Sequence, residues 1–215
     1  MLPFGRSAVF HLFSSSPSPL TNEHGLSPRT TLNVHDCDGE GREWHVQGSV
    51  AKVSIYQSKN IAALHLPGRI LTSTVEIWSC SNVNLVIGPS SPPASPDESS
   101  PLGTLQLDPS LHDVSIRFTS PASVGKIVVA PSVSQTSDGR PSFGFSNVTL
   151  QVGDEEPFVL ADADGNLYQP QEPKIVLRPS DPPQDAPAQW VIGREEGKWK
   201  ADGLERGEKD YPVLA

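Results

Sequence analysis

A repeat of about 20 residues is the feature of this sequence that most restricts its fold. Gly48, Gly68 and Gly88 recur at a constant spacing, and similar segments lie before and after each of them. These segments are Trp44–Val46, Ile61–Leu66 and Val83–Ile87 before the glycines, and Val53–Ile55, Val75–Ile77 and Leu105–Leu107 after them. Apolar residues alternate in each segment, which is typical of short β-strands with one buried face.

A second marker recurs along the same stretch of chain. Asn60, Asn82, Asp113 and Asn147 each stand directly before a β-branched residue. Asn and Asp tolerate left-handed backbone geometry and therefore suit a sharp corner, while Gly can serve at the other corner. Two strands and two corners take about 20 residues, the length of one rung of a β-solenoid. The predicted fold is all-β: a right-handed parallel β-helix (β-solenoid) with about 20-residue rungs and a C-terminal β-hairpin arm.

Proline-rich stretches divide the chain. Residues 89–101 and 135–142 interrupt the repeat, and the prolines of the first stretch lack the amide donor that a central strand needs, so we predict inserted loops. Residues 179–187 are predicted to be an extended linker. The expected organisation is a flexible N-terminal leader at residues 1–30, the solenoid at 31–178, the linker at 179–187, and the hairpin arm and tail at 188–215.

Composition excludes several classes of protein. The net charge of −9 disfavours a nucleic-acid-binding surface, because such surfaces need clustered Lys and Arg. No apolar run approaches the roughly 18 to 20 residues that a membrane-spanning helix requires. Cys37 and Cys80 are too few for a disulfide framework and fit a reducing compartment. We therefore expect a cytoplasmic protein that binds neither nucleic acid nor membrane.

Residues 68–88, GRILTSTVEIWSCSNVNLVIG, resemble the rungs of the C-terminal domain of cyclase-associated proteins. Tubulin-binding cofactor C shares this superfamily, and the resemblance covers about residues 36–206. It implies binding of monomeric actin, assistance in actin nucleotide exchange and a role in cytoskeleton organisation. It also implies a homodimer in which the C-terminal hairpin swaps between protomers. The residues that would carry this swap are Gln189, Trp190, Ile192, Lys198, Trp199 and Leu204.

The exposed strand faces of the predicted solenoid are its natural surface for a partner, because they align side chains over a flat area. Alternation and corner position select the candidate partner-binding residues. They are Lys52, Lys59, Arg69, Glu76, Trp78, Asn84, His112 and Arg117. Trp78 stands out because it follows Ile77 at a strand end, where a partner can cover it. The alternative interpretation for each of the eight is a solvated face or ordinary corner packing.

Two other functions remain open beside an actin-binding module. One is a protein-interaction scaffold with no actin activity. The other is a cofactor C-like regulator of tubulin or a small GTPase, whose catalytic arginine neutralises charge in the transition state. Gln106 stands where the resemblance would place that arginine, which weakens the regulator hypothesis.

We expect that the protein is not an enzyme and that it binds no cofactor and no metal. The carboxylates of Glu76, Asp108 and Asp113 are scattered, and neither a GxSxG elbow nor a P-loop occurs. His35, Cys37 and His45 lack the spacing of a zinc site. The stretch from Asp162 to Asn166 reads as an Asp-Gly turn rather than a calcium loop, because it lacks the full set of ligands.

Overall fold

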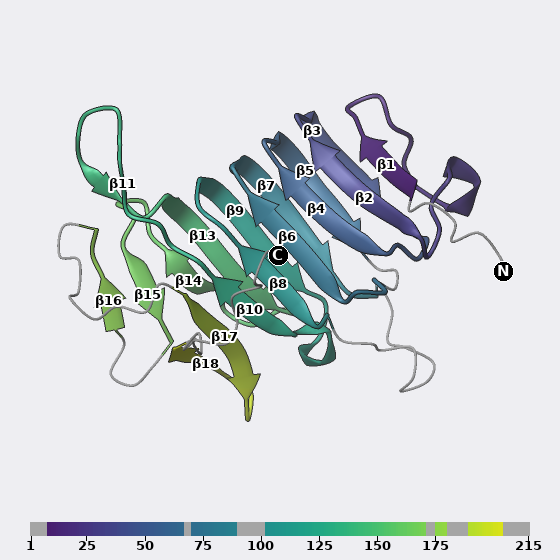
Figure 1. Cartoon of the computed structure of the whole chain (residues 1–215). Coiled ribbons are helices and arrows are strands. Elements are labelled where there is room, and N and C mark those ends of the chain that lie inside the picture. Colours follow the sequence, from purple (N-terminus) through teal and green to yellow (C-terminus); the bar gives the residue numbers. More distant parts are fainter. Residues whose placement is uncertain (1–7, 67–69, 90–101, 171–174, 180–188, 204–215) are drawn as a thin grey trace, which may run out of the picture.

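The computed structural model describes residues 8–66, 70–89, 102–170, 175–179 and 189–203, and among them it contains strands and short 3₁₀ turns but no α-helix. Two eight-stranded sheets form the body (Figure 1). The first sheet contains, in spatial order, β1 (Ala8–Leu12), β2 (Thr30–His35), β4 (Lys52–Tyr56), β6 (Thr74–Trp78), β8 (Thr104–Leu107), β10 (Lys126–Val129), β17 (Trp190–Glu195) and β18 (Lys198–Gly203). The second sheet contains β3 (Asp38–His45), β5 (Lys59–Leu66), β7 (Cys80–Ile87), β9 (Leu111–Phe118), β13 (Phe145–Val152), β14 (Phe158–Ala161), β15 (Leu167–Gln169) and β16 (Ile175–Leu177).

From β2 to β10 the chain passes alternately through the first and the second sheet, so each strand from β2 to β8 pairs in parallel with the strand two places later. Leu32 pairs with Val53, and Val53 in turn pairs with Val75. One rung therefore takes about 20 residues, as the sequence repeat indicates. The predictions of an all-β fold and of this repeat length are confirmed. The arrangement of parallel strands is compatible with a β-solenoid.

Alternate residues of both sheets point inward and form one core. Val53, Val75 and Leu105 stack in the first sheet and Leu64, Leu85, Ile116 and Leu150 in the second, and each of these is 0% exposed. Burial of such a side chain stabilises the fold by about 1.5–3 kcal/mol relative to exposure. The core extends along the whole stack because every rung adds the same inward positions.

The corners that follow the strands of the first sheet contain the predicted left-handed residues. Asn60, Asn82, Asp113 and Asn147 have φ values of 55°, 53°, 55° and 50°. The Asn82 amide donates a hydrogen bond to Asn60 Oδ1 at 3.1 Å, and the Asn60 amide donates to Asp38 Oδ1 at 3.0 Å. Asn147 likewise donates to Asp113 Oδ1 at 2.8 Å, so three of the four corner residues bond to a side chain of the preceding rung. The prediction of a repeated corner is confirmed.

The N-terminal segment joins the fold, contrary to the expected flexible leader. Strand β1 pairs in parallel with β2, and Leu12, Leu20 and Leu26 are 0%, 0% and 2% exposed. A 3₁₀ turn, η1 (Asn22–His24), lies between Leu20 and Leu26. The expectation for residues 1–30 is therefore wrong for residues 8–30, because these leucines cover the open end of the core. Residues 1–7 lie outside the described part.

The other end of the stack is completed by antiparallel strands. The hairpin β17–β18 pairs with β10, placing Trp190 beside Val129 and Ile192 beside Ile127. After β13 the second sheet continues as the antiparallel strands β14, β15 and β16. The 135–142 insert lies at a two-stranded ribbon, β11 (Ser134–Gln135) and β12 (Pro141–Ser142), which projects from the body (Figure 1). A further 3₁₀ turn, η3 (Pro121–Ser123), precedes β10.

Several predicted segments fall outside the described residues. They are Gly68, most of the 89–101 insert and most of the 179–187 linker. The described part of the chain contains no helix with the length and apolar character needed to cross a membrane.

We predict that Asn82→Ala lowers the free energy of unfolding by about 2 kcal/mol. Alanine loses the hydrogen bond to Asn60, and it adopts the left-handed backbone region less readily than asparagine, whose side chain can hydrogen-bond locally. Asn82→Gly is the matched control. It loses the same hydrogen bond but tolerates the backbone, so we expect a smaller loss of about 1 kcal/mol. Urea unfolding measures both. Equal losses in the two variants would show that backbone geometry does not select Asn at this corner.

Candidate functional site

The predicted partner-binding residues divide between the outer faces of the two sheets. Lys52, Glu76 and Trp78 lie on β4 and β6 of the first sheet. Lys59, Asn84, His112 and Arg117 lie on β5, β7 and β9 of the second sheet. Arg69 lies outside the described residues. The division arises because consecutive strands of the repeat belong to different sheets, so alternation alone selects outward residues on both.

Three aromatic side chains stack at the strand ends of the first sheet. The ring of Tyr56 lies 4.2 Å from that of His35 and 4.5 Å from that of Trp78, nearly parallel to the indole at 4°. The three residues are direct partners in the parallel register of β2, β4 and β6, and all are partly exposed. We call His35, Tyr56 and Trp78 the aromatic row. It is built by register, since each rung places one ring above the next.

Charged and amide side chains lie on the same face beside the aromatic row. Lys52 Nζ lies 2.7 Å from Glu76 Oε1, and Gln106 Nε2 donates to Asp108 Oδ2 at 2.8 Å. Burial raises the pKa of the Asp108 carboxyl, with Gln106 opposing the rise and Glu76 adding to it. The Gln106 amide is therefore committed to Asp108.

On the second sheet the predicted residues make contacts within the chain. The Asn84 amide donates to the carbonyl oxygen of Ala62 at 2.7 Å, where the register of β5 shifts against β7. Arg117 contacts Asp154 at 2.8 Å, and His112 Nδ1 lies 2.8 Å from Ser146 Oγ. Lys59 Nζ lies 3.3 Å from Asp38 Oδ2. These contacts join neighbouring parts of the stack.

The residues expected at a dimer contact pack within the chain's own hairpin and core. Trp190 and Ile192 are 1% and 0% exposed. The guanidinium of Arg194 lies 5.2 Å from the ring centre of Trp199, and Arg194 also pairs with Glu155 at 2.8 Å. Gln189 precedes β17, Lys198 begins β18, and Leu204 lies outside the described residues. The hairpin thus completes the core of the chain at this end.

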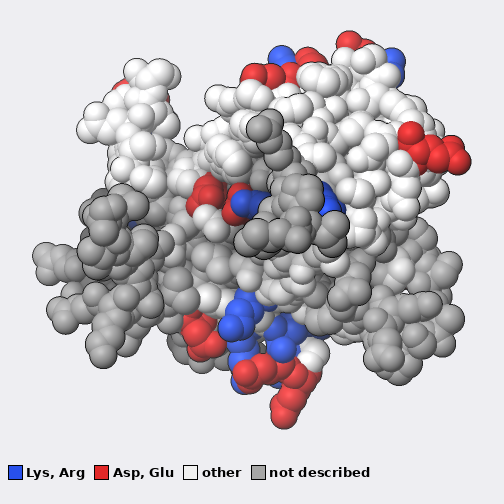
Figure 2. Space-filling model, turned by 45° about the vertical axis from the view of Figure 1, so that its right-hand side comes forward, with Lys and Arg blue, Asp and Glu red and all other residues white. Residues whose placement is uncertain are grey.

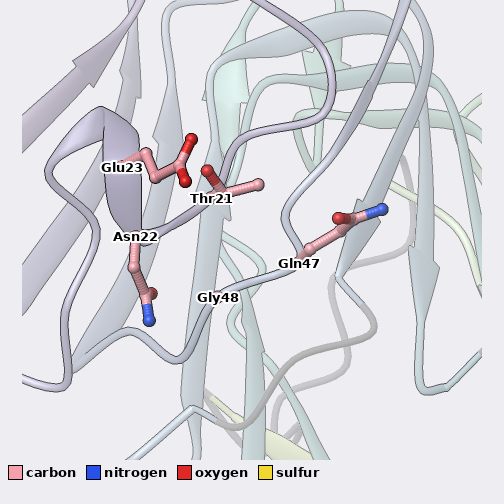
Figure 3. Close-up of a pocket in the computed structure, with 5 residues that line it drawn as sticks. All are labelled: Thr21, Asn22, Glu23, Gln47 and Gly48. Atoms are coloured by element: carbon pink, nitrogen blue, oxygen red, sulfur yellow. The ribbon is translucent and has the colours of Figure 1, made fainter.

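A polar pocket lies between η1 and the turn after β3 (Figure 3). Its lining residues are Thr21, Asn22, Glu23, Gln47 and Gly48. A Cβ at Gly48 would lie 2.6 Å from Asn22 Oδ1, so this repeat glycine permits a close approach rather than a left-handed corner. Among the five lining residues only Glu23 has an ionisable side chain, so the pocket offers no pair of groups for acid–base catalysis.

The cysteines show no sign of nucleophilic chemistry. Cys37 and Cys80 are buried and free. Burial raises the pKa of Cys37, and it raises the pKa of Cys80 to about 11, so both thiols stay protonated at neutral pH. In the 162–166 segment, the Asp162 carboxylate accepts backbone hydrogen bonds from Asp164 and Asn166, as an Asx turn does. The turn interpretation of this segment is confirmed.

The structure also brings together a cluster of side chains that was not predicted from the sequence. Glu43, His45 and His65 lie together on the outer face of the second sheet, with the two imidazole rings 4.0 Å apart and nearly parallel. Burial is the main cause that lowers the pKa of His65, followed by the neighbouring His45. The only sequence signal for this cluster is the repeat itself, whose parallel pairing brings His65 beside His45.

On the face shown in Figure 2, the charged side chains of the described residues lie in small groups. Figure 2 shows blue and red side chains close to one another, with large uncharged areas between the groups. Among the described residues of this face, no broad basic surface for nucleic acid is visible. Comparisons with family models, with curated proteins and with solved structures gave no match to this chain.

We predict that Cys80 of the folded protein reacts about 100-fold more slowly with a thiol reagent at pH 8 than in denaturant, because its pKa of about 11 leaves a far smaller thiolate fraction than the ordinary value of 9.0. A Cys37→Ser variant isolates the Cys80 signal. Equal rates in the folded and unfolded states would contradict the buried, protonated thiol.

Proposed function

We propose that this chain is a right-handed β-solenoid that works as a protein-binding module, with the outer face of the first sheet around the aromatic row as its binding face. The aromatic row carries this proposal. Trp and Tyr are enriched among the residues that dominate binding energy, and here Tyr56 and Trp78 occupy equivalent positions in consecutive rungs, with His35 stacked on Tyr56.

The rigidity and the charge of this face favour binding of a protein. Stacking holds Tyr56 and Trp78 in place, so little side-chain entropy remains to be lost when a partner covers them. The Lys52–Glu76 ion pair beside them presents both signs of charge and can orient a partner without a strong net field. Neither the pocket near η1, which has a single carboxylate, nor the protonated thiols compete with this face as a functional site.

Monomeric actin is the partner that we propose. The support is the resemblance of residues 68–88 to the cyclase-associated protein domain, a stretch that includes Glu76 and Trp78 of the proposed binding face. The proposal extends to a cytoplasmic role in actin nucleotide exchange. If the chain is instead a scaffold for a different protein, we propose the same binding face. A cofactor C-like regulator of a GTPase lacks support because Gln106 stands where the resemblance would place the catalytic arginine.

We predict that the full chain binds ADP-bound monomeric actin saturably and that Trp78→Ala weakens this binding by about 10- to 100-fold, as expected for a central aromatic residue. Titration of labelled actin, with nucleotide release followed in the same sample, measures both activities. Trp78→Phe should retain most of the affinity because it keeps a ring in the stack.

Arg117→Ala is the matched control on the opposite sheet, and we expect an affinity within about twofold of the wild type. Absence of saturable binding at about 100 μM would reject actin as the partner. Equal effects of Trp78→Ala and Arg117→Ala would reject the first sheet as the binding face.

We also propose a homodimer formed by exchange of the hairpin β17–β18. In the described chain the hairpin joins the core through one antiparallel pairing, β10 with β17, and buries Trp190 and Ile192 there. Exchange between two copies would keep every one of these contacts, which makes domain swapping a low-cost route to a dimer. The proline-rich sequence of residues 179–187 supplies a connection that suits such an exchange.

We predict that a Val128→Cys, Val191→Cys double variant forms an intermolecular disulfide, because these two residues are direct partners between β10 and β17. A covalent dimer on a non-reducing denaturing gel, with light scattering at twice the 23.1 kDa chain mass, is the expected result. Val128→Cys alone is the control. An exclusively intramolecular disulfide in a 23.1 kDa particle would contradict the exchange.

A further inference from the structure

Three metal-ligating side chains converge on the outer face of the second sheet. His45 at the end of β3 and His65 on β5 are direct partners in the parallel register, and Glu43 precedes His45 by two residues on the same face of β3. One potential ligand atom from each residue lies within 4.8 Å of the other two. The cluster comes from two rungs of the stack, and the backbone pairing fixes its spacing.

The residue types are those of a transition-metal site, but the two nearly parallel imidazole rings must turn before both can direct a lone pair at one ion. Two imidazole nitrogens and a carboxylate oxygen are a ligand set that Zn²⁺ uses, with bonds of about 2.0–2.2 Å and the donor atoms therefore about 3.3 Å apart in a tetrahedral arrangement. Closing the cluster to this size requires rotation of the side chains. Glu43 can make such a rotation because its side chain is 60% exposed.

The two imidazoles have ring nitrogens available for a metal. Within the described residues no hydrogen bond to a ring nitrogen of His45 or His65 is present, and the one charged contact is His65 Nε2 to Glu43 Oε2 at 3.9 Å. Other histidines differ in this respect. His35 Nε2 lies 2.8 Å from Gln57 Oε1, and His112 Nδ1 lies 2.8 Å from Ser146 Oγ.

The cluster combines two imidazoles with one carboxylate, that of Glu43. A bound divalent ion would be neutralised in part by Glu43. In addition, it would link β3, the edge strand of the sheet, to β5.

We propose that Glu43, His45 and His65 bind a divalent first-row transition metal, with Zn²⁺ as the leading candidate and water completing the coordination. Three protein ligands leave one position open to solvent, unlike the closed set of four in a purely structural zinc site. Because Cu²⁺ generally binds nitrogen ligands more tightly than Zn²⁺, it should occupy the same site with higher affinity. The site is separate from the aromatic row, which lies on the first sheet.

Titration of ZnCl₂ into tag-free, metal-free full-length protein tests the proposal by calorimetry. We expect saturable binding of one ion per chain, weakened at least about tenfold by His45→Gln or His65→Gln and about fivefold by Glu43→Gln, since each removes one ligand. His112→Gln is the matched control, a partly bonded histidine of the same sheet, and should change the affinity less than about twofold. Thermal unfolding of each variant without metal verifies folding.

A second measurement needs no substitution. Addition of substoichiometric Cu²⁺ to the wild-type protein should broaden the ring proton signals of His45 and His65 before those of the other four of the six histidines. Selective broadening of this pair supports the site even if a variant fails to fold. Absence of saturable Zn²⁺ binding up to about 1 mM, an equal loss in His112→Gln, or uniform broadening of all six histidines would overturn the proposal.

Discussion

The parallel register between successive rungs is the constraint on which the rest of the structure depends. It places Val53 beside Val75 in the core, Asn60 beside Asn82 at the corner and Tyr56 beside Trp78 on the surface. A slip of one residue in any strand would turn its apolar side chains to solvent and bury the polar ones. Core, corners and surface rows are therefore consequences of one pairing, repeated from rung to rung.

Features that the chain encodes locally could be predicted from the sequence. Alternation around Val75 and Ile77 and the Asn before Val83 identify a strand and a corner without knowledge of the rest of the fold. The role of the N-terminal segment could not be predicted in this way. Leu12, Leu20 and Leu26 are widely and unevenly spaced, and their burial depends on a core end that exists only after the rungs have stacked.

The two surface clusters also could not be predicted from local sequence patterns. Trp78 could be identified as an aromatic residue at a strand end, but its stacking on Tyr56 depends on the register between two rungs. His45 and His65 likewise belong to different rungs, whereas sequence rules for metal sites mostly consider closely spaced pairs of ligands. Comparing equivalent positions of successive rungs would have found both clusters. The repeat that identified the fold therefore also identifies which distant residues meet.

The segment from Ser14 to Leu20 runs along the outer edge of β3. Arg42 Nη1 and Trp44 Nε1 donate to the carbonyl oxygens of Ser14 and Ser16, and the Leu20 amide donates to the His45 carbonyl oxygen at 2.7 Å. A stack of parallel strands without such a cover would present unpaired backbone groups on which another copy could add its own rungs. The Leu20 amide takes one of these backbone groups, the His45 carbonyl oxygen, and the rest of the segment lies across the edge, so another copy would have to displace it before adding a rung at this end.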